Sequence, residues 1–272
     1  MKAVRIAGAL GAEIGGVDLS RPLPKDELAE LRRLWLEHLV IFFRNQKLSE
    51  KQYMLFAGQL GEPVEYPMVK GLEGFPKIIE VKKLEHERVA FGNIWHTDTA
   101  YLERPPMASM LLAREVPPVG GDTLFANMYL AIESLSPGLK RLLEGLRAVN
   151  SSTKADASKT REDVLKASGK KAKDFMAEHP VVRTHPETGR KALYVNSGHT
   201  VRFAGWTEDE SAALLRFLFD WQTKPEFTCR FSWQPGSIAL WDNRCVQHNP
   251  VNDYHGYRRV MHRITLAGDV PA

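Results

Sequence analysis

The chain has 272 residues, of which 43% are hydrophobic, so it is long enough to bury the core of one large domain. Its 37 basic and 33 acidic residues leave a net charge of +4, which gives no reason to expect a nucleic-acid partner. Two cysteines without a Cys-x-x-Cys pair argue against a disulfide framework or a zinc ribbon. No apolar run reaches eighteen residues, so we expect no membrane segment and a cytoplasmic protein.

The first sixty residues are predicted to combine short strands with amphipathic helices. Glycines within residues 3–19 indicate two short strands joined by a tight turn. Leucines three and four residues apart predict a helix over residues 25–38, and the apolar run 40–43 predicts a strand buried on both faces. Ser49 and Gln52 have the spacing of a capping box, which predicts a second helix up to residue 60.

The segment at about residues 62–94 is less regular, with prolines and glycines around one predicted strand at 77–81. Long loops in compact enzymes often cover or line a binding site. Because this segment leads directly into a candidate metal motif, we predict that part of it is a lid, with an ordinary surface loop as the alternative. Tyr66 and Asn93 are its candidates for contact with a substrate.

The remainder of the chain contains many short strands. Two short helices are expected within residues 127–146, the second capped by Ser136, and Thr207 with Glu210 caps a longer helix. Strands are predicted at 107–112, 122–125, 180–184, 191–195, 227–233 and 238–241, the last two forming a hairpin. Short strands without βαβ alternation favour a mainly β fold with flanking helices, a double-stranded β-helix or jelly roll, and we treat residues 1–272 as one domain.

Residues 151–178 differ from the rest of the chain in composition. They are rich in lysine, poor in large apolar side chains, and carry interleaved acidic residues without aromatic ones. A segment that binds single-stranded nucleic acid would need aromatic side chains for base stacking. We therefore predict a solvated insertion with one helix at the mouth of the pocket.

A His-x-Asp triplet, His96 and Asp98, is the first half of a candidate metal site. Side chains two residues apart on a strand point to the same face and can hold one ion, although the pair alone also fits a surface turn. His248 would complete two imidazoles and one carboxylate, the arrangement of non-haem Fe(II) oxygenases, which leaves positions for a cosubstrate and O2. By contrast, His185 has no partner at ligand spacing and is expected in solvent or in a cap, and Asp242 is expected to organise its loop.

Arg259 and Arg263 lie on one face of a predicted strand shortly after His248. Burying two guanidinium groups without partners is costly, so either acidic side chains or an anionic ligand must neutralise them. An anionic ligand fits the open positions on the metal.

These motifs resemble the taurine dioxygenase and 2,4-dichlorophenoxyacetate dioxygenase family of Fe(II)/2-oxoglutarate-dependent enzymes. The resemblance covers nearly the whole chain, from Leu10-Gly11-Ala12-Glu13-Ile14 through Gly120-Gly121-Asp122-Thr123 to the Trp241–His248 block and Arg258-Arg259-Val260-Met261-His262-Arg263. It implies that His96, Asp98 and His248 are iron ligands. It also implies that Thr123 and Arg259 bind the distal carboxylate of 2-oxoglutarate. Arg263 would lie near the other carboxylate and the anionic group of the substrate.

The resemblance further implies hydroxylation of a C–H bond with release of succinate and CO2, and a homo-oligomer, either a dimer or a tetramer. Tyr66, Asn93, His199 and Arg263 are the expected substrate contacts. The chain departs from taurine enzymes at Pro63, where they carry a sulfonate-binding histidine, and at His199, where they carry an aromatic residue. His199 adds a polar group expected to titrate near neutrality.

These departures favour a small anionic substrate other than taurine, namely another alkylsulfonate, a sulfate ester or an aryloxyalkanoate. Two other classes of protein stay open at this point. A zinc hydrolase uses similar ligands, but it would have no use for a converging anion site. A non-catalytic binding module on the same barrel would need a broken set of metal ligands.

Overall fold

The computed structural model describes residues 1–90, 92–154 and 174–272 of the chain. Its helices are α1 Lys25–His38, α2 Glu50–Leu60, α3 Met128–Glu133, α4 Pro137–Glu144, α6 Glu208–Gln222 and the short 3-10 helix η2 Pro225–Phe227. Its strands are β1 Lys2–Arg5, β2 Ala12–Gly15, β3 Val40–Phe43, β4 Pro63–Val64, β5 Ile78–Lys83, β6 Ala108–Glu115, β7 Thr123–Asn127, β8 Arg147–Ser151, β9 Met176–Pro180, β10 Val182–Thr184, β11 Lys191–Leu193, β12 Thr200–Phe203, β13 Thr228–Phe231, β14 Ile238–Asp242, β15 Val246–Pro250 and β16 Arg259–Leu266.

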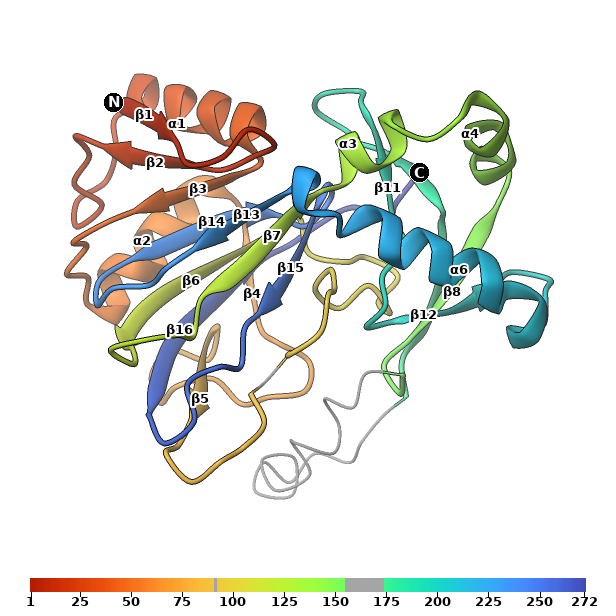
Figure 1. Ribbon diagram of the computed structural model, residues 1–272. Helices are drawn as coiled ribbons and strands as arrows, with labels where there is room; N and C mark the ends of the chain where they lie inside the picture. The colour runs from red at the N-terminus through yellow and green to blue at the C-terminus, as the bar shows by residue number, and fades with distance from the viewer. Residues whose placement is uncertain (91, 155–173) are drawn as a thin grey trace.

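Two facing sheets make up the centre of the molecule (Figure 1). The large sheet has the order β1-β2-β3-β14-β6-β16-β4, with β5 also paired to β16, and the smaller sheet has the order β13-β7-β15. This is the mainly β, jelly-roll architecture with flanking helices that the sequence predicts. Two further small sheets, β12-β8-β9 and β10-β11, lie next to α3, α4 and α6.

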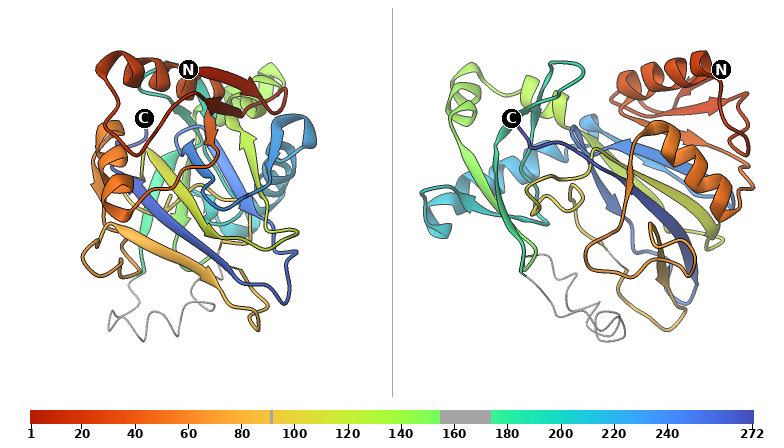
Figure 2. Two further views of the ribbon diagram at one scale, coloured as in Figure 1. Left: turned by 90° about the vertical axis from the view of Figure 1, so that its left-hand side faces the viewer. Right: turned by 180° about the vertical axis from the view of Figure 1, so that it is seen from behind.

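Alternation along the central strands places the two sides of the large sheet in different cores. On β3, Val40 and Phe42 pack into the core between the sheets, together with Phe125 of β7. Ile41 and Phe43 point the other way, into the core covered by α1 and α2. Figures 1 and 2 show these two helices beside the large sheet. The predicted burial of residues 40–43 on both faces is confirmed.

The local signals for helix starts are confirmed as well. Ser49 with Gln52 and Thr207 with Glu210 form complete capping boxes at the starts of α2 and α6. Ser136 caps α4 through the backbone N–H of Leu139. No helix in the described ranges is long and apolar enough to span a membrane.

The predicted hairpin of residues 227–241 is wrong. β13 pairs with β7 in the small sheet, whereas β14 pairs with β3 and β6 in the large sheet. The turn at Gly236 therefore carries the chain from one sheet to the other. β14 lies between β3 and β6 in the large sheet, and β13 forms the edge of the small sheet beside β7, so each strand finds its hydrogen-bond partners in distant segments.

His185 was expected in solvent or in a cap, and the expectation of a solvent-exposed side chain is wrong. Its side chain is buried, and Nε2 lies 3.0 Å from Oδ2 of Asp242. Nδ1 accepts hydrogen bonds from two backbone N–H groups, so Nε2 carries the proton and donates to the carboxylate. Arg244 donates to both oxygens of Asp242. His185, Asp242 and Cys245 are close enough to hold a metal ion, but these hydrogen bonds occupy both ring nitrogens of His185 and both carboxylate oxygens of Asp242. The network organises the loop, as expected for Asp242.

The predictions for the irregular segment 62–94 and the basic insertion 151–178 have different outcomes. In the region 62–94, β4 and β5 both pair with β16, so part of the proposed lid segment is integrated into the large sheet. The basic insertion 151–178 separates the paired strands β8 and β9, and the prediction of a solvated helix concerns residues 155–173, which lie outside the described residues.

Candidate active site

His96, Asp98 and His248 meet at one end of the two facing sheets. His96 and His248 exchange backbone hydrogen bonds of 3.1 and 2.9 Å, so their strands are held side by side although they are far apart in sequence. Asp98 Oδ1 lies 3.5 Å from Nε2 of His96 and 3.9 Å from Nε2 of His248. All three side chains are buried, at 2 to 7% exposure. Three donor atoms therefore converge within reach of one ion.

The hydrogen bonds around the triad prepare these atoms for a metal. Nδ1 of His96 lies 2.7 Å from the carbonyl oxygen of Ile94, which makes Nδ1 the protonated nitrogen and leaves the lone pair on Nε2. Oδ2 of Asp98 accepts a hydrogen bond of 2.6 Å from Ser109 and forms an ion pair of 2.8 Å with Arg263. The second oxygen, Oδ1, is thus left to face the imidazoles. The donor set fits Fe(II) in the two-histidine, one-carboxylate arrangement.

Electrostatics favour the protonation states of Asp98 and His248 that a metal requires. Burial opposes ionisation of Asp98, but the charge of Arg263 and the two histidines hold the pKa of this carboxyl well below its usual value. Burial, followed by the proximity of His96, lowers the pKa of His248. A neutral imidazole and an ionised carboxylate are the forms that bind metal ions.

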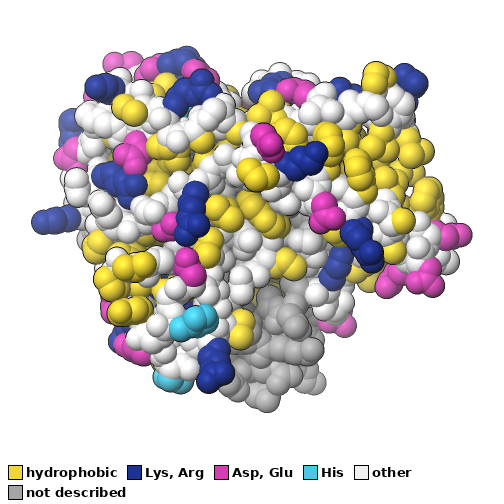
Figure 3. Space-filling model, in the orientation of Figure 1, with side chains coloured by type: hydrophobic (Ala, Val, Ile, Leu, Met, Phe, Trp, Pro, Cys, Tyr) yellow, Lys and Arg dark blue, Asp and Glu magenta, His cyan; other side chains and the backbone are white. Residues whose placement is uncertain are grey.

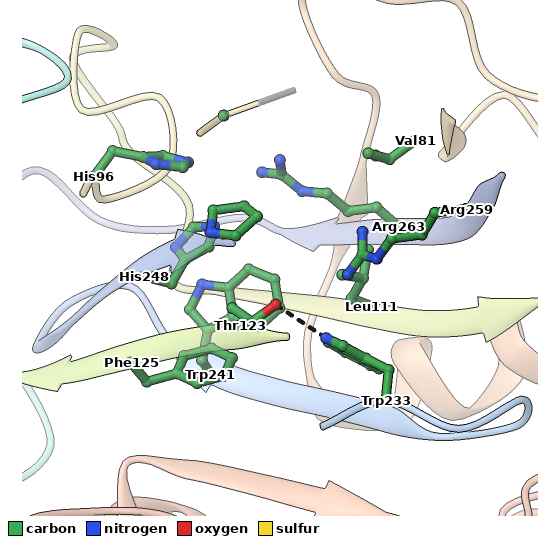
Figure 4. A pocket seen from close by; sticks show the side chains of 12 residues that line it. Val81, His96, Leu111, Thr123, Phe125, Trp233, Trp241, His248, Arg259 and Arg263 are labelled. Carbon is green, nitrogen blue, oxygen red and sulfur yellow. Dashed lines mark hydrogen bonds between the residues drawn. The ribbon is translucent and has the colours of Figure 1, made fainter. Parts of the chain in front are cut away.

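A pocket opens between the two sheets beside the triad (Figure 4). His96 and His248 lie at one end, and Arg259 and Trp233 lie at the other. The guanidinium of Arg263 extends toward the triad, with Nη2 2.8 Å from Oδ2 of Asp98. The complete lining consists of Val81, Gly92, His96, Leu111, Thr123, Phe125, Trp233, Trp241, His248, Pro250, Arg259 and Arg263. Its apolar walls and few convergent polar groups are typical of a small-molecule site.

Arg259 is a buried cation without an acidic partner among the residues that the structure describes. It is 5% exposed, and its Nε and Nη2 have no hydrogen-bond partner in the described part of the chain. Burial lowers the pKa of the guanidinium because the charged form loses its hydration. Its Cζ atom lies 5.7 Å from the ring centre of Trp233. An unpaired buried charge of this kind is expected to bind an anion, and it fits the distal carboxylate of 2-oxoglutarate.

Thr123 stands next to Arg259 and has a free donor. Its Oγ1 accepts a hydrogen bond of 3.0 Å from Nε1 of Trp233, drawn as the dashed line in Figure 4. The hydroxyl proton of Thr123 can therefore point into the pocket, toward the same anion. Trp233 was not predicted as a site residue, because a single tryptophan at the end of a strand is more often part of a core.

The expected substrate contacts are placed unevenly around the site. Tyr66 is buried, and its ring centre lies 5.2 Å from Cζ of Arg263. His199 is buried with its ring 5.9 Å from that of His96, outside the pocket lining. Asn93 is exposed and does not line the pocket, so its role stays a prediction. Arg263 lies in the pocket, with Nε buried and unpartnered in the described ranges.

The expectation that His199 titrates near neutrality is wrong. Burial, with a smaller contribution from the charge of His96, lowers the pKa of His199 to about 3. The imidazole is therefore neutral at physiological pH and does not titrate near neutrality. Its hydrogen-bonding capacity, rather than its charge, distinguishes it from a phenyl ring.

A jelly roll that brings two imidazoles and one carboxylate together beside a cationic pocket has the features of a non-haem Fe(II) oxygenase. The family model described as "Taurine catabolism dioxygenase TauD, TfdA family" matches residues 3–265. The chain belongs to this family, and it is a dioxygenase that depends on Fe(II), 2-oxoglutarate and O2. The zinc hydrolase and the non-catalytic module are thereby set aside.

Similarity to individual proteins extends over almost the entire chain. An alkylsulfatase of Acinetobacter baylyi is 38% identical, over 98% of this chain and 84% of its own length. An alpha-ketoglutarate-dependent sulfate ester dioxygenase of Pseudomonas putida is 37% identical, over 98% of this chain and 89% of its own. The crystal structure of a taurine dioxygenase from Burkholderia xenovorans matches with a TM-score of 0.85 and 37% identity, covering 100% of this chain and 92% of that one.

Proposed function

We propose that this enzyme releases sulfate from small alkyl sulfate esters. The observation that carries the proposal is Arg263, a buried guanidinium at the iron end of the pocket whose Nε still lacks a partner in the described residues. A buried cation at this position favours an anionic substrate. Two relatives named for sulfate esters, at 38 and 37% identity, support the ester over the sulfonate and the aryloxyalkanoate.

In this proposal the three buried donors hold the iron, through Nε2 of His96, Nε2 of His248 and Oδ1 of Asp98. Iron and O2 supply the oxidation that converts 2-oxoglutarate to succinate and CO2 and hydroxylates a substrate C–H bond. Arg259 and the hydroxyl of Thr123 bind the distal carboxylate of the cosubstrate, and Trp233 fixes the direction of that hydroxyl. The apolar walls exclude water from the reacting groups.

Sulfate release then needs no further catalytic group. Hydroxylation of the carbon that carries the ester oxygen gives a 1-hydroxyalkyl sulfate. The bond between that carbon and the ester oxygen breaks, the hydroxyl proton passes to the leaving group, and the products are an aldehyde and hydrogensulfate. The same steps on an alkylsulfonate would release sulfite, and on an aryloxyalkanoate a phenol. The released group, which is sulfate, sulfite or a phenol, therefore identifies the substrate class.

The test compares alkyl sulfates, alkylsulfonates, taurine and aryloxyalkanoates at equal concentration with Fe(II) and 2-oxoglutarate. We expect the highest kcat/KM for an alkyl sulfate, with aldehyde, sulfate and succinate formed in equal amounts. A clear preference for taurine with release of sulfite would contradict the sulfate ester assignment. Formation of sulfate without succinate would contradict the proposed oxidative route and indicate hydrolysis.

A homo-oligomer, as dimer or tetramer, and a cytoplasmic location also remain proposals, based on family resemblance. Acidic and basic side chains are interspersed on the face of the molecule shown in Figure 3. A surface with mixed charges is expected to be solvated, whereas a nucleic-acid partner would need a basic patch. We therefore propose a small-molecule substrate and no nucleic-acid partner.

A further inference from the structure

A second buried cation, Lys83, lies next to Arg259. Lys83 is the last residue of β5 and is 3% exposed, and its Nζ has no hydrogen-bond partner among the described residues. The preceding residue, Lys82, has the ordinary environment of a lysine, because it is exposed and forms an ion pair of 2.8 Å with Glu80. A buried ammonium group without an acceptor is costly, so the environment of Lys83 requires an explanation.

The strand register directs Lys83 toward the pocket. β5 and β16 are antiparallel, and Lys83 lies directly opposite Arg259 in an unbroken register. Residues directly opposite each other in such a pair carry their side chains on the same face. Val81, two residues earlier on β5, shares that face and lines the pocket beside Arg259. The ammonium and guanidinium groups therefore extend from neighbouring strands on the pocket side of the sheet.

One aromatic ring contacts both cations. Nζ of Lys83 lies 4.6 Å from the ring centre of Tyr254, and Cζ of Arg259 lies 6.0 Å from the same centre. A Cβ atom at Gly121 would come within 3.3 Å of Tyr254 and 3.4 Å of Arg259, so the backbone packs closely against this group. The faces of aromatic rings attract cations but do not neutralise them. Nζ of Lys83 and Nε and Nη2 of Arg259 have no hydrogen-bond partner in the described ranges, and two positive charges held this way favour a bound anion.

We propose that Lys83 is a second cation for the distal carboxylate of the cosubstrate, acting together with Arg259. The inference rests on the proposed role of Arg259 in binding that carboxylate. Arg259 in the pocket wall, with the charge of Lys83 beside it, favours a 2-oxo acid that ends in a carboxylate over one that ends in a methyl group. Lys83 would thus contribute to the preference for 2-oxoglutarate over 2-oxo monocarboxylic acids, which share the chelating end and lack the distal charge.

The test measures binding by calorimetry, using enzyme loaded with Mn(II) so that no turnover occurs. The ligands are 2-oxoglutarate and 2-oxopentanoate, which has the same chain length without the distal carboxylate. We expect Lys83→Met to weaken the binding of 2-oxoglutarate about tenfold and to leave the binding of 2-oxopentanoate unchanged. Lys83→Arg, which keeps the charge, should restore most of the affinity for 2-oxoglutarate.

Two control variants separate this inference from the assignments on which it rests. Lys82→Met removes a lysine from the opposite face of the same strand and should change neither affinity. Arg259→Ala should weaken 2-oxoglutarate binding by at least as much as Lys83→Met. If Arg259→Ala has no effect, the proposed cosubstrate site is wrong. If Arg259→Ala weakens binding and Lys83→Met does not, only the role of Lys83 is wrong.

Loss of fold in the methionine variant is detected by thermal unfolding followed by circular dichroism. Lys83→Gln, which has a polar and uncharged side chain, then replaces Lys83→Met in the same comparison. Equal weakening of 2-oxoglutarate and 2-oxopentanoate in the folded variant would mean that Lys83 only supports Tyr254 and the surrounding loop, and that outcome would overturn the proposal.

Discussion

Arg263 forms an ion pair of 2.8 Å with Oδ2 of Asp98, and this contact leaves the other oxygen of the carboxylate facing the two imidazoles. The same guanidinium faces the ring of Tyr66 at 5.2 Å. Arg263 therefore contacts both a proposed iron ligand and a proposed substrate residue. The proposed metal and substrate sites share one charged side chain, so a change at Arg263 should affect both.

Asp98→Asn tests the metal site with little change in shape. The amide cannot offer the charged oxygen that the ion requires and loses its ion pair with Arg263. We expect the variant to lose the binding of one Fe(II) per chain and all formation of succinate. Metal content and succinate production check this, and Ser109→Ala is the matched control, because it removes one hydrogen bond to Asp98 and should weaken iron binding only in part. Full activity in Asp98→Asn would refute the proposed ligand set.

Arg259→Ala tests the cosubstrate site. Removing a charge-assisted contact worth about 1.5 to 3 kcal/mol should raise the KM for 2-oxoglutarate by roughly ten- to a hundred-and-fifty-fold. Arg258→Ala is the control, because Arg258 is partly exposed and pairs with Glu115. Steady-state kinetics at saturating substrate gives the KM for 2-oxoglutarate of both variants. An unchanged KM in Arg259→Ala would place the carboxylate elsewhere.

His199→Phe tests the substrate side of the site. His199 packs edge-on against Tyr101, with ring centres 4.9 Å apart, and against His96. Because the pKa of His199 is lowered to about 3, we expect no change in the pH profile between pH 6 and 8. We do expect a change of several-fold in the ratio of kcat/KM values between alkyl sulfates and taurine, since a polar ring is replaced by an apolar one. An identical substrate profile would exclude a role in specificity.

The buried ion pair of Asp242 and Arg244 gives a prediction about stability in acid. Burial opposes ionisation of Asp242, but hydrogen bonds from Arg244 and His185 lower its pKa to about 2, from an ordinary value near 3.8. A carboxyl group with a lowered pKa in the folded state stabilises the protein above its unfolded pKa and loses that contribution as the pH falls. The contribution is about 2 kcal/mol, and it should disappear between about pH 4 and pH 2.

Urea unfolding of metal-free protein at a series of pH values measures this contribution. Asp242→Asn should be destabilised by about 3 kcal/mol or more at pH 7, because Arg244 loses a buried partner. The difference in free energy of unfolding between the two proteins should stay constant above about pH 5 and shrink toward pH 2. A difference that is independent of pH in the acid range would show that Asp242 is not ionised in the fold.

The sequence predicts those parts of the fold and site that depend on local spacing. The capping boxes at Ser49 and Thr207 and the leucine pattern of residues 25–38 each involve a few neighbouring residues, and all three are confirmed. The His-x-Asp triplet is local in the same sense. The convergence of His96, Asp98 and His248 could be expected because the metal chemistry demands a third ligand.

Features that depend on pairing between distant strands could not be predicted. The turn after Trp233 looks like a hairpin turn, yet its two strands belong to different sheets. Lys83 cannot be distinguished from Lys82 by residue type, and only the register with β16 decides which of the two is buried.

The reciprocal backbone bonds between His96 and His248 tie the reactive centre to completion of the fold. During synthesis, His96 and Asp98 are made long before His248. The three side chains meet only when the two sheets have formed. The full ligand set therefore exists only in folded protein. By mass action, ferrous ion should slow unfolding and be released when the strands separate, so a damaged molecule does not retain an oxidising centre.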